Sequence, residues 1–229
     1  MNNISAIKVI STDLFRTLVK VDENRGFIWR TFMGETYDNE IAQKYWDRAT
    51  EILFNNLDAA AVNLSPFKNI RDIFMESYTL LFAEINFQYD PRSAAEILFQ
   101  GHNLNQLFDD TRPFLQAAGT RYPICLSTDC DCDMLDGIEN IYGFDKMFVS
   151  EQMRTYKSHP RFFTQVLEHY RLKPENILHI GDSKSDILTP KQLGIQTCWL
   201  NRSGEQWEHE VKPDFEVKSL LDILEILGI

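Results

Sequence analysis

The sequence is short of the features that mark nucleic-acid-binding or membrane-docking proteins. Its 23 lysine and arginine residues are outnumbered by 34 aspartate and glutamate residues, so the formal net charge is −11. Binding to nucleic acid needs a surplus of cations that neutralises phosphates, and docking on anionic lipid needs the same surplus. We therefore expect neither nucleic acid nor a membrane as a partner. A few local cations can still hold one small anionic substrate.

Long apolar runs and a dense set of cysteines are also lacking. No apolar stretch approaches the ~20 residues that span a bilayer. Residues 1–5 show no basic segment followed by an apolar one, as a signal peptide would. The four cysteines, at positions 125, 130, 132 and 198, are too few for the disulfide framework of a secreted scaffold. We expect a cytoplasmic protein with free thiols.

The chain is long enough to bury a sizeable core. Its 229 residues, 44% of them hydrophobic, suit one large domain, or a domain of about 130–150 residues with a smaller insert. Residues 7–12 are a β-branched and apolar run that ends at Asp13. This run predicts a buried strand with Asp13 at its carboxyl end.

The pattern then becomes helical as far as about residue 107. Apolar residues recur at three- and four-residue steps and predict helices over 24–35, 38–57, 66–85 and 91–107. Pro66 and Pro91 fall where helices would begin. We expect a small antiparallel bundle, with most of its many aromatic residues packed in its core.

Beyond residue 108, strands and helices alternate. Strands are expected over 122–128, 146–150, 176–180 and 195–200, and helices over 131–141, 159–171 and 218–227, with a short one after residue 182. This alternation predicts an α/β fold, with a parallel sheet and helices on both faces. The expected core is 1–20 plus 108–229, and the bundle over 21–107 is an inserted cap. In such sheets the ligand binds at the carboxyl ends of the strands.

Four groups of polar residues fall at those strand ends. They are Asp13-Leu14-Phe15-Arg16-Thr17-Leu18, then Ser127-Thr128-Asp129, then Lys157 ahead of a helix, then Gly181-Asp182-Ser183-Lys184-Ser185-Asp186. In this order and spacing they resemble the four motifs of the haloacid dehalogenase (HAD) superfamily of hydrolases. The insert stands where that family carries a helical cap, and the resemblance implies a Rossmann-like core.

The resemblance assigns a role to each motif. Asp13 would be the nucleophile that forms a covalent aspartyl intermediate. The catalytic set that it implies is Asp13, Thr17, Ser127 and Lys157. Ser127, Thr128, Lys157 and Arg16 are expected to contact the substrate, with Lys157 neutralising the charge that develops there.

Three carboxylates, those of Asp13, Asp182 and Asp186, are expected to converge. Without a cation their mutual repulsion would raise one or more of their pKa values. An all-oxygen site with two or three carboxylates suits Mg²⁺. The resemblance adds the backbone carbonyl of Phe15 as a further ligand of this ion.

Phe15 is the main departure from the family pattern. Phosphatases of the family carry there a second aspartate, which protonates the leaving oxygen and then activates water. Losing a positioned acid and base typically costs about 10²–10⁴ in rate. Dehalogenases of the family carry an aromatic residue at this position, but they work without a metal and lack the Gly-Asp pair that this chain keeps as Gly181-Asp182.

Three functions therefore remain open. The first is a Mg²⁺-dependent phosphatase that acts on a small phosphorylated metabolite through an aspartyl phosphate, for which a good leaving group such as an acyl phosphate would need less help. The second is a 2-haloacid dehalogenase-like hydrolase, and the third is a phosphate-binding or regulatory module with weak turnover. The alternating segment from Asp129 to Asp133 is interpreted as a helix start with incidental thiols, and His179 as a packed residue. The substrate and the oligomeric state are not readable from the sequence.

Overall fold

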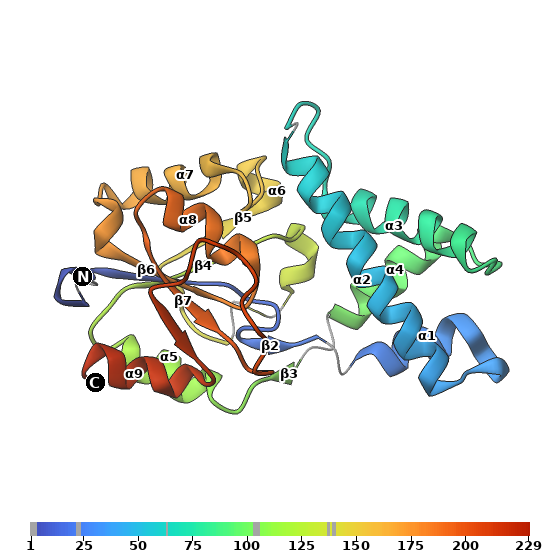
Figure 1. Cartoon of the computed structure of the whole chain (residues 1–229), viewed down its shortest axis with the longest axis horizontal. Helices are drawn as coiled ribbons and strands as arrows, with labels where there is room; N and C mark the ends of the chain where they lie inside the picture. Colours follow the sequence, from blue (N-terminus) through green and yellow to red (C-terminus); the bar gives the residue numbers. More distant parts are fainter. Residues whose placement is uncertain (1–3, 22–23, 63, 103–105, 137, 139–140) are drawn as a thin grey trace.

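The computed structural model describes residues 4–21, 24–62, 64–102, 106–136, 138 and 141–229. Among these residues a parallel sheet has the strand order β5-β4-β1-β6-β7-β8. The strands are β1 (Val9–Thr12), β4 (Ile124–Thr128), β5 (Lys146–Val149), β6 (Ile177–Gly181), β7 (Gln196–Leu200) and β8 (Phe215–Val217). The first strand lies between β4 and β6, so its end lies in the middle of the sheet (Figure 1).

Helices cover both faces of this sheet. On one side lie α6 (Ser150–Met153), α7 (Pro160–Tyr170) and α8 (Leu188–Gln192), and on the other lie α5 (Thr111–Ala118) and α9 (Leu220–Leu227) (Figure 1). Successive side chains of β1 point to opposite faces and so contribute to both layers. Val9 packs with the phenylalanines of α7, while Ile10 joins the larger cluster on the other face. The predicted α/β class is confirmed.

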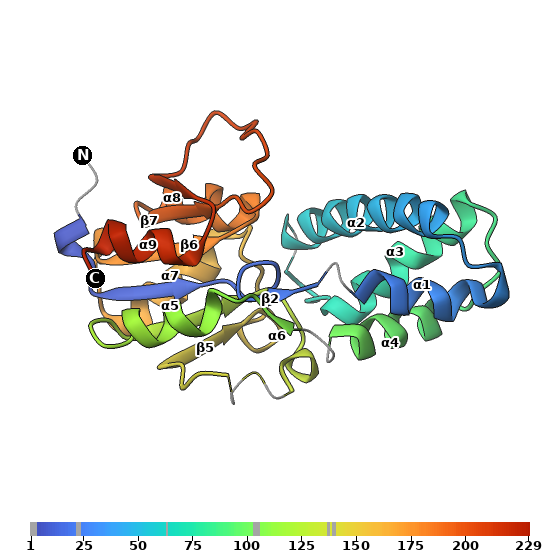
Figure 2. The ribbon, with the colours of Figure 1, turned by 90° about the horizontal axis from the view of Figure 1, so that it is seen from below.

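A bundle of four helices forms a second body beside the sheet (Figures 1 and 2). It contains α1 (Arg25–Met33), α2 (Asn39–Val62), α3 (Ile70–Glu84) and α4 (Pro91–His102). The chain enters and leaves it beside a two-stranded antiparallel pair, β2 (Val19–Lys20) and β3 (Gln106–Leu107). The helical insertion after β1 is therefore confirmed, while domain limits at 20/21 and 107/108 stay a prediction.

The end of the cap nearest the sheet rests on the core through directional bonds. The carboxylate of Asp131 accepts hydrogen bonds from the backbone N–H groups of Ile70 and Arg71, at 2.8 and 2.9 Å, and so caps the start of α3 from the other domain. Tyr156 stacks on Phe67 with ring centroids 5.0 Å apart. The loop before α3 is therefore held against the core next to the strand ends.

Several predicted elements differ from those observed. In the region of the helix expected over 131–141, the structure has the 3₁₀ turn η4 (Cys132–Leu135); Asp131, at the N-cap of this turn, makes no cap bond to it and accepts from α3 instead. The third cap helix begins at Ile70 behind its cap Asn69 rather than at residue 66. The fourth ends at His102, and residues 103–105 lie outside the described part. Short elements not predicted are α5, α6, β2, β3, β8 and the 3₁₀ turns η1 (Ile4–Ala6), η3 (Gly34–Thr36) and η6 (Pro174–Asn176).

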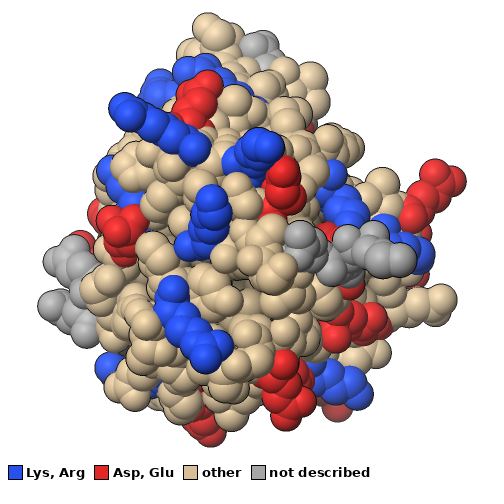
Figure 3. All heavy atoms as spheres, turned by 90° about the vertical axis from the view of Figure 1, so that its left-hand side faces the viewer, with Lys and Arg blue, Asp and Glu red and all other residues tan. Residues whose placement is uncertain are grey.

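Charges of both signs are spread over the face of the core that lies away from the cap. Lysine, arginine, aspartate and glutamate side chains are interspersed there with uncharged ones (Figure 3). On this face no basic stripe of the kind that follows a nucleic-acid backbone is seen. In the described part of the chain, no helix has the length and apolar character needed to cross a bilayer.

Candidate active site

The end of β1 places Asp13 against a buried lysine. The Asp13 backbone N–H donates to the carbonyl of Ile180 at 2.8 Å, which extends the sheet by one residue. Lys157 Nζ donates to Asp13 Oδ1 at 2.5 Å and to Asp186 Oδ1 at 2.6 Å, and all three side chains are nearly inaccessible to solvent. Burial lowers the Lys157 pKa, but the facing carboxylates outweigh this effect and hold it well above its ordinary value. Motifs one, three and four therefore meet as predicted.

Asp186 is held by protein groups on both of its oxygens. Besides Lys157, Oδ1 is bonded to His179 Nε2 at 2.9 Å, while Oδ2 accepts from the Ser183 N–H at 3.1 Å and its hydroxyl at 2.6 Å. The bond from the Ser183 N–H is one half of the capping box of the 3₁₀ turn η7 (Lys184–Asp186); in the other half the Ser183 hydroxyl accepts from the Asp186 N–H. Burial raises the Asp186 pKa, but Lys157 and His179 outweigh this effect and lower it.

Gly181 makes this arrangement sterically possible. A Cβ added at Gly181 would lie 2.2 Å from Asp186 Cγ and 2.5 Å from its Oδ2, far closer than atoms approach in proteins. The glycine at the end of β6 is thus required by the close approach of the Asp186 carboxylate, not by its backbone angle.

A chain of buried hydrogen bonds runs beneath the site. His179 Nδ1 lies 2.8 Å from Ser11 Oγ, and Ser11 Oγ lies 2.8 Å from Ser127 Oγ. Burial lowers the His179 pKa, so the ring is neutral, and the carboxylate at Nε2 places its proton there. Ser11 then donates to His179, and Ser127 donates to Ser11.

This direction bears on the two hydroxyls of the second motif. Ser127, predicted to donate to the substrate, points its proton into the sheet, and it does not line the cleft. The buried Thr128 Oγ1 has no hydrogen-bond partner among the described residues. Thr128 is fully buried as well and does not line the cleft, so a substrate contact by either hydroxyl stays a prediction.

The three predicted carboxylates do converge. One oxygen from each of Asp13, Asp182 and Asp186 lies within 4.8 Å of the others. Burial, reinforced by the charges of Asp13 and Asp186, raises the Asp182 pKa to about 8. Burial also raises the Asp13 pKa to about 6, although Lys157 opposes the shift.

This donor set fits a hard divalent cation, which would relieve the repulsion between the carboxylates. Because both oxygens of Asp186 already have protein partners, Asp13 and Asp182 are the residues best placed to bind an ion directly. Thr17 Oγ1 lies 3.4 Å from Asp182 Oδ1, so it contacts this acid. A ligand role for the Phe15 carbonyl stays a prediction.

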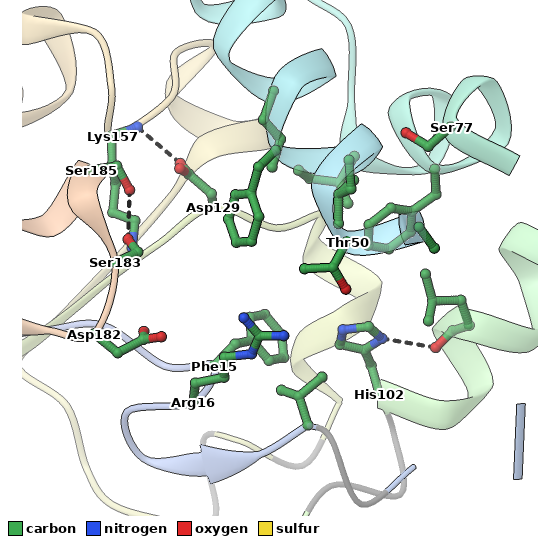
Figure 4. A pocket seen from close by; sticks show the side chains of 18 of the residues that line it. Phe15, Arg16, Thr50, Ser77, His102, Asp129, Lys157, Asp182, Ser183 and Ser185 are labelled. Atoms are coloured by element: carbon green, nitrogen blue, oxygen red, sulfur yellow. Dashed lines mark hydrogen bonds between the residues drawn. The ribbon is translucent and has the colours of Figure 1, made fainter. Parts of the chain in front are cut away.

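The cluster opens into a cleft between core and cap. Figure 4 shows Asp129, Lys157 and Asp182 on the core side, Thr50, Ser77 and His102 on the cap side, and Phe15 and Arg16 between them. Most of the cap wall is apolar: it is formed by Trp46, Ala49, Leu53, Phe54, Leu57, Ile70, Phe74 and Leu98.

Phe15 and Arg16 both face this cleft. The Phe15 ring meets His102 edge-on, with centroids 5.0 Å apart. Arg16 adopts a left-handed backbone with φ of 61°, a conformation that costs a non-glycine residue energy. Its side chain lies near Asp182, whose pKa it lowers. Arg16 therefore lines the cleft, while its expected contact with the substrate stays a prediction.

Asp129 is a cleft residue to which the sequence assigned no chemical role. It directly follows β4, and its Oδ1 accepts the Lys157 backbone N–H at 3.0 Å. Burial, with the charges of Asp13 and Asp186, outweighs Lys157 and raises the Asp129 pKa to about 7. The sequence signal for a chemical role was an acid at the end of a strand. The segment from Asp129 to Asp133 was interpreted as a helix start instead, so no chemical role was assigned to Asp129.

Comparison with known proteins identifies the family. A model of the haloacid dehalogenase-like hydrolases matches residues 7–194, and the chain belongs to this family. The putative HAD-hydrolase YfnB from Bacillus subtilis, whose structure was solved bound to magnesium, superposes with a TM-score of 0.80 at 19% identity. The superposition covers 97% of this chain and 99% of that one. At this identity the likeness establishes the fold, including the helical cap.

Sequence relatives are divided between two chemistries. A phosphoglycolate phosphatase from Vibrio parahaemolyticus is 28% identical over 138 residues, which are 56% of this chain and 60% of that one. Haloacetate dehalogenase H-2 from Moraxella is 28% identical over 87 residues, 38% of this chain and 39% of that one. The chain thus spans less than two thirds of these relatives, and similarity alone does not choose between phosphatase and dehalogenase.

Proposed function

We propose that the protein is a Mg²⁺-dependent phosphatase that acts on a small phosphorylated metabolite with Asp13 as nucleophile. The observation that carries this proposal is the convergence of Asp13, Asp182 and Asp186 within 4.8 Å around a buried lysine. A site that displaces a halide without a metal gains nothing from the extra acid of Asp182. A magnesium-bound fold neighbour and phosphatase relatives support the same reading.

The geometry suits a two-step transfer. An oxygen of Asp13 attacks the phosphorus atom, the bond from phosphorus to the leaving oxygen breaks, and an aspartyl phosphate forms. Lys157 holds Asp13 Oδ1 in place and offsets the negative charge of the transferring group. Water then attacks the phosphorus atom, and the electron pair of the breaking bond returns to Asp13.

When bound by Asp13 and Asp182, Mg²⁺ would supply positive charge to the phosphoryl oxygens. The chain's own residues do the rest. Asp186 and His179 hold Lys157 in position from below, while Thr128 and Arg16 are offered as substrate contacts from the core side. The cap closes the cleft with an apolar wall that limits access of water.

A dehalogenase-like hydrolase is the second candidate, and Phe15 is the observation that favours it. A halide leaves without a proton, so an aromatic residue at this position is no handicap there. Its weakness is Asp182: burial, together with the charges of Asp13 and Asp186, raises the pKa of this acid to about 8, and a metal-free reaction has no use for it.

The test is hydrolysis of p-nitrophenyl phosphate and acetyl phosphate by the wild type and Asp13→Asn, each with Mg²⁺ and with EDTA. We expect turnover that requires both Mg²⁺ and Asp13, with a loss of about 10³–10⁶-fold in the variant. Chloride release from 2-chloropropionate in EDTA, without phosphate release from either ester, would favour the dehalogenase instead. Turnover that survives Asp13→Asn would remove Asp13 from the reaction.

A further inference from the structure

The proposed phosphatase lacks a proton donor where the family carries one, because the Phe15 side chain has no ionisable group. An alkoxide or phenolate leaving group needs such a proton, and the attacking water later needs a base. We propose that Asp129 is the general acid and base of this enzyme, acting from the end of β4 in place of the residue at position 15. This inference rests on the proposed function and adds a catalytic residue to it.

The position of Asp129 suits the role. It lines the same cleft as Asp13 and Phe15, and Figure 4 shows it on the core wall beside Lys157. Its Oδ1 is anchored by the Lys157 backbone N–H at 3.0 Å, and the ammonium of the same lysine holds Asp13. Among the described residues, its second oxygen has no hydrogen-bond partner. One oxygen therefore fixes the carboxyl group and the other is free to exchange a proton.

The charges around Asp129 leave it able to act in both directions. Burial has the largest effect, Lys157 opposes it, and Asp186 and Asp13 add to it, so the pKa lies at about 7. Tyr156 is a further titratable neighbour, whose own pKa is raised by burial and by the Asp129 charge. A carboxyl that titrates near neutrality can both give a proton and take one.

The imidazole on the opposite wall is a weaker candidate. His102 Nδ1 lies 2.8 Å from the Leu98 carbonyl, which only accepts, so the ring proton is on Nδ1. Burial lowers the His102 pKa to about 4, which leaves Nε2 without a proton. His102 therefore has no proton to give to a leaving group. Asp58, another acid in the cleft, is paired with Lys184 at 2.5 Å.

The proposed cycle conserves atoms, electrons and protons. In the first step Asp13 bonds to phosphorus, the bond to the leaving oxygen breaks, and the Asp129 proton passes to that oxygen to give the alcohol. In the second step a water oxygen bonds to phosphorus and one of its protons passes to the Asp129 carboxylate. The bond between phosphorus and Asp13 breaks, phosphate leaves, and both aspartates return to their starting states.

The experiment compares wild type and Asp129→Asn on three Mg²⁺-supplemented substrates: phenyl phosphate, p-nitrophenyl phosphate and acetyl phosphate. Asparagine keeps the oxygen that accepts the Lys157 N–H but has no acidic proton. We expect turnover of phenyl phosphate to fall by about 10²–10⁴-fold. With p-nitrophenyl phosphate, whose leaving group needs no proton, we expect a burst of one equivalent of nitrophenolate and then slow turnover. The phosphoenzyme that accumulates would be seen by intact mass.

Three further measurements make the test specific. Asp133→Asn, an exposed aspartate four residues further on, is the matched control and is expected to behave as wild type. Adding Phe15→Asp to Asp129→Asn is expected to restore phenyl phosphate turnover. In the wild type, kcat/KM for phenyl phosphate is expected to fall above about pH 7, while that for acetyl phosphate holds, because the donor must be protonated.

The outcomes separate this inference from the proposed function. If wild type turns over phosphate esters and folded Asp129→Asn does so equally well, Asp129 is not the acid and base. Equal losses on all three substrates, without a burst and without rescue by Phe15→Asp, would also overturn the role. A wild type that releases phosphate from none of the three overturns the proposed function itself, and the inference with it.

Discussion

The two walls of the cleft are built on different physical principles. On the core side the groups meet through short, directional bonds, as in the run from Asp13 through Lys157 to Asp186 and His179. On the cap side the lining is mostly apolar, and the aromatic rings behind it pack edge-on, as Trp29 does against Phe32 at 5.2 Å. Buried polar networks accept few changes, whereas apolar packing accepts substitutions that conserve volume.

The difference indicates where each part of the function resides. The core wall holds the nucleophile and its charges, so it fixes the reaction. The cap wall offers shape with few hydrogen-bonding groups, so it selects the organic part of the substrate. A change in the core is expected to alter rate, and a change in the cap is expected to alter stability or choice of substrate.

The largest effect is expected when a buried aromatic ring is removed from the interior of the cap bundle, because the cap depends on apolar packing. Trp29 is fully buried in α1, and we expect Trp29→Ala to cost about 3–5 kcal/mol of stability. Urea unfolding measures the loss, and Phe27→Ala, from the same helix but 41% exposed, is the control. A loss below about 1 kcal/mol would show that the bundle does not depend on this ring.

On the core side, one methyl group added at Gly181 should disrupt the directional bonds of the site. In Gly181→Ala the new Cβ would lie 2.2 Å from Asp186 Cγ, so the carboxylate must move away from Lys157. We expect a loss of about 10²-fold in turnover and about 1–3 kcal/mol in stability. Gly26→Ala in the cap, where the nearest atom is 4.0 Å away, should leave turnover unchanged. Equal activity of the two variants would mean that the Asp186 position is not critical.

The Asp131→Ala variant tests the contact that joins the core to the cap. Loss of the carboxylate that caps α3 from the core should cost about 1–2 kcal/mol. Hydrogen exchange at the Ile70 and Arg71 amides should accelerate, because these N–H groups lose their acceptor. Asp136→Ala, at an exposed aspartate of the core, provides the comparison, and unchanged exchange in Asp131→Ala would contradict a role in docking.

The smallest expected effect is a pH dependence of stability that comes from the core wall. The pKa of Asp129 is raised by burial from 3.8 to about 7, so between these values the folded state keeps a proton that the unfolded state releases. Stability from this group therefore falls as the pH rises through that window. Asp129→Asn removes the effect, so in metal-free buffer its Tm relative to wild type should rise by about 2–4 °C between about pH 6 and 7. A constant difference would contradict the raised pKa.

The parts of the site that the sequence predicted are those tied to strand ends. Asp13 and Asp182 directly follow strands, and a parallel sheet brings such positions together, whereas Lys157 was indicated by the family resemblance and lies in the loop between α6 and α7. Ser127 and Thr128 show the limit of such predictions from the sequence. Neighbouring residues in a strand point to opposite faces, and two adjacent hydroxyls give no sign of which one faces the substrate.

Contacts between the core and the cap could not be predicted from the sequence for a related reason. Asp131 stands in a run that is typical of a helix start, yet its carboxylate caps a helix that begins more than 60 positions earlier. Local propensity does not record such long-range partners. Asp129 was passed over because its raised pKa depends on burial, which only the folded arrangement of β4 and Lys157 creates.

The central place of β1 has a consequence for how the chain is made. Ile10 pairs with Ile124 on one side and with Leu178 on the other, so the strand that leaves the ribosome first waits for both of its neighbours. The cap helices are contiguous and local, and can form in the meantime, whereas long-range parallel pairing is slow. Asp13 therefore acquires its surroundings only after β6 has been synthesised. A chain interrupted before that point would carry a formed bundle beside an exposed apolar strand, which is a form prone to aggregation.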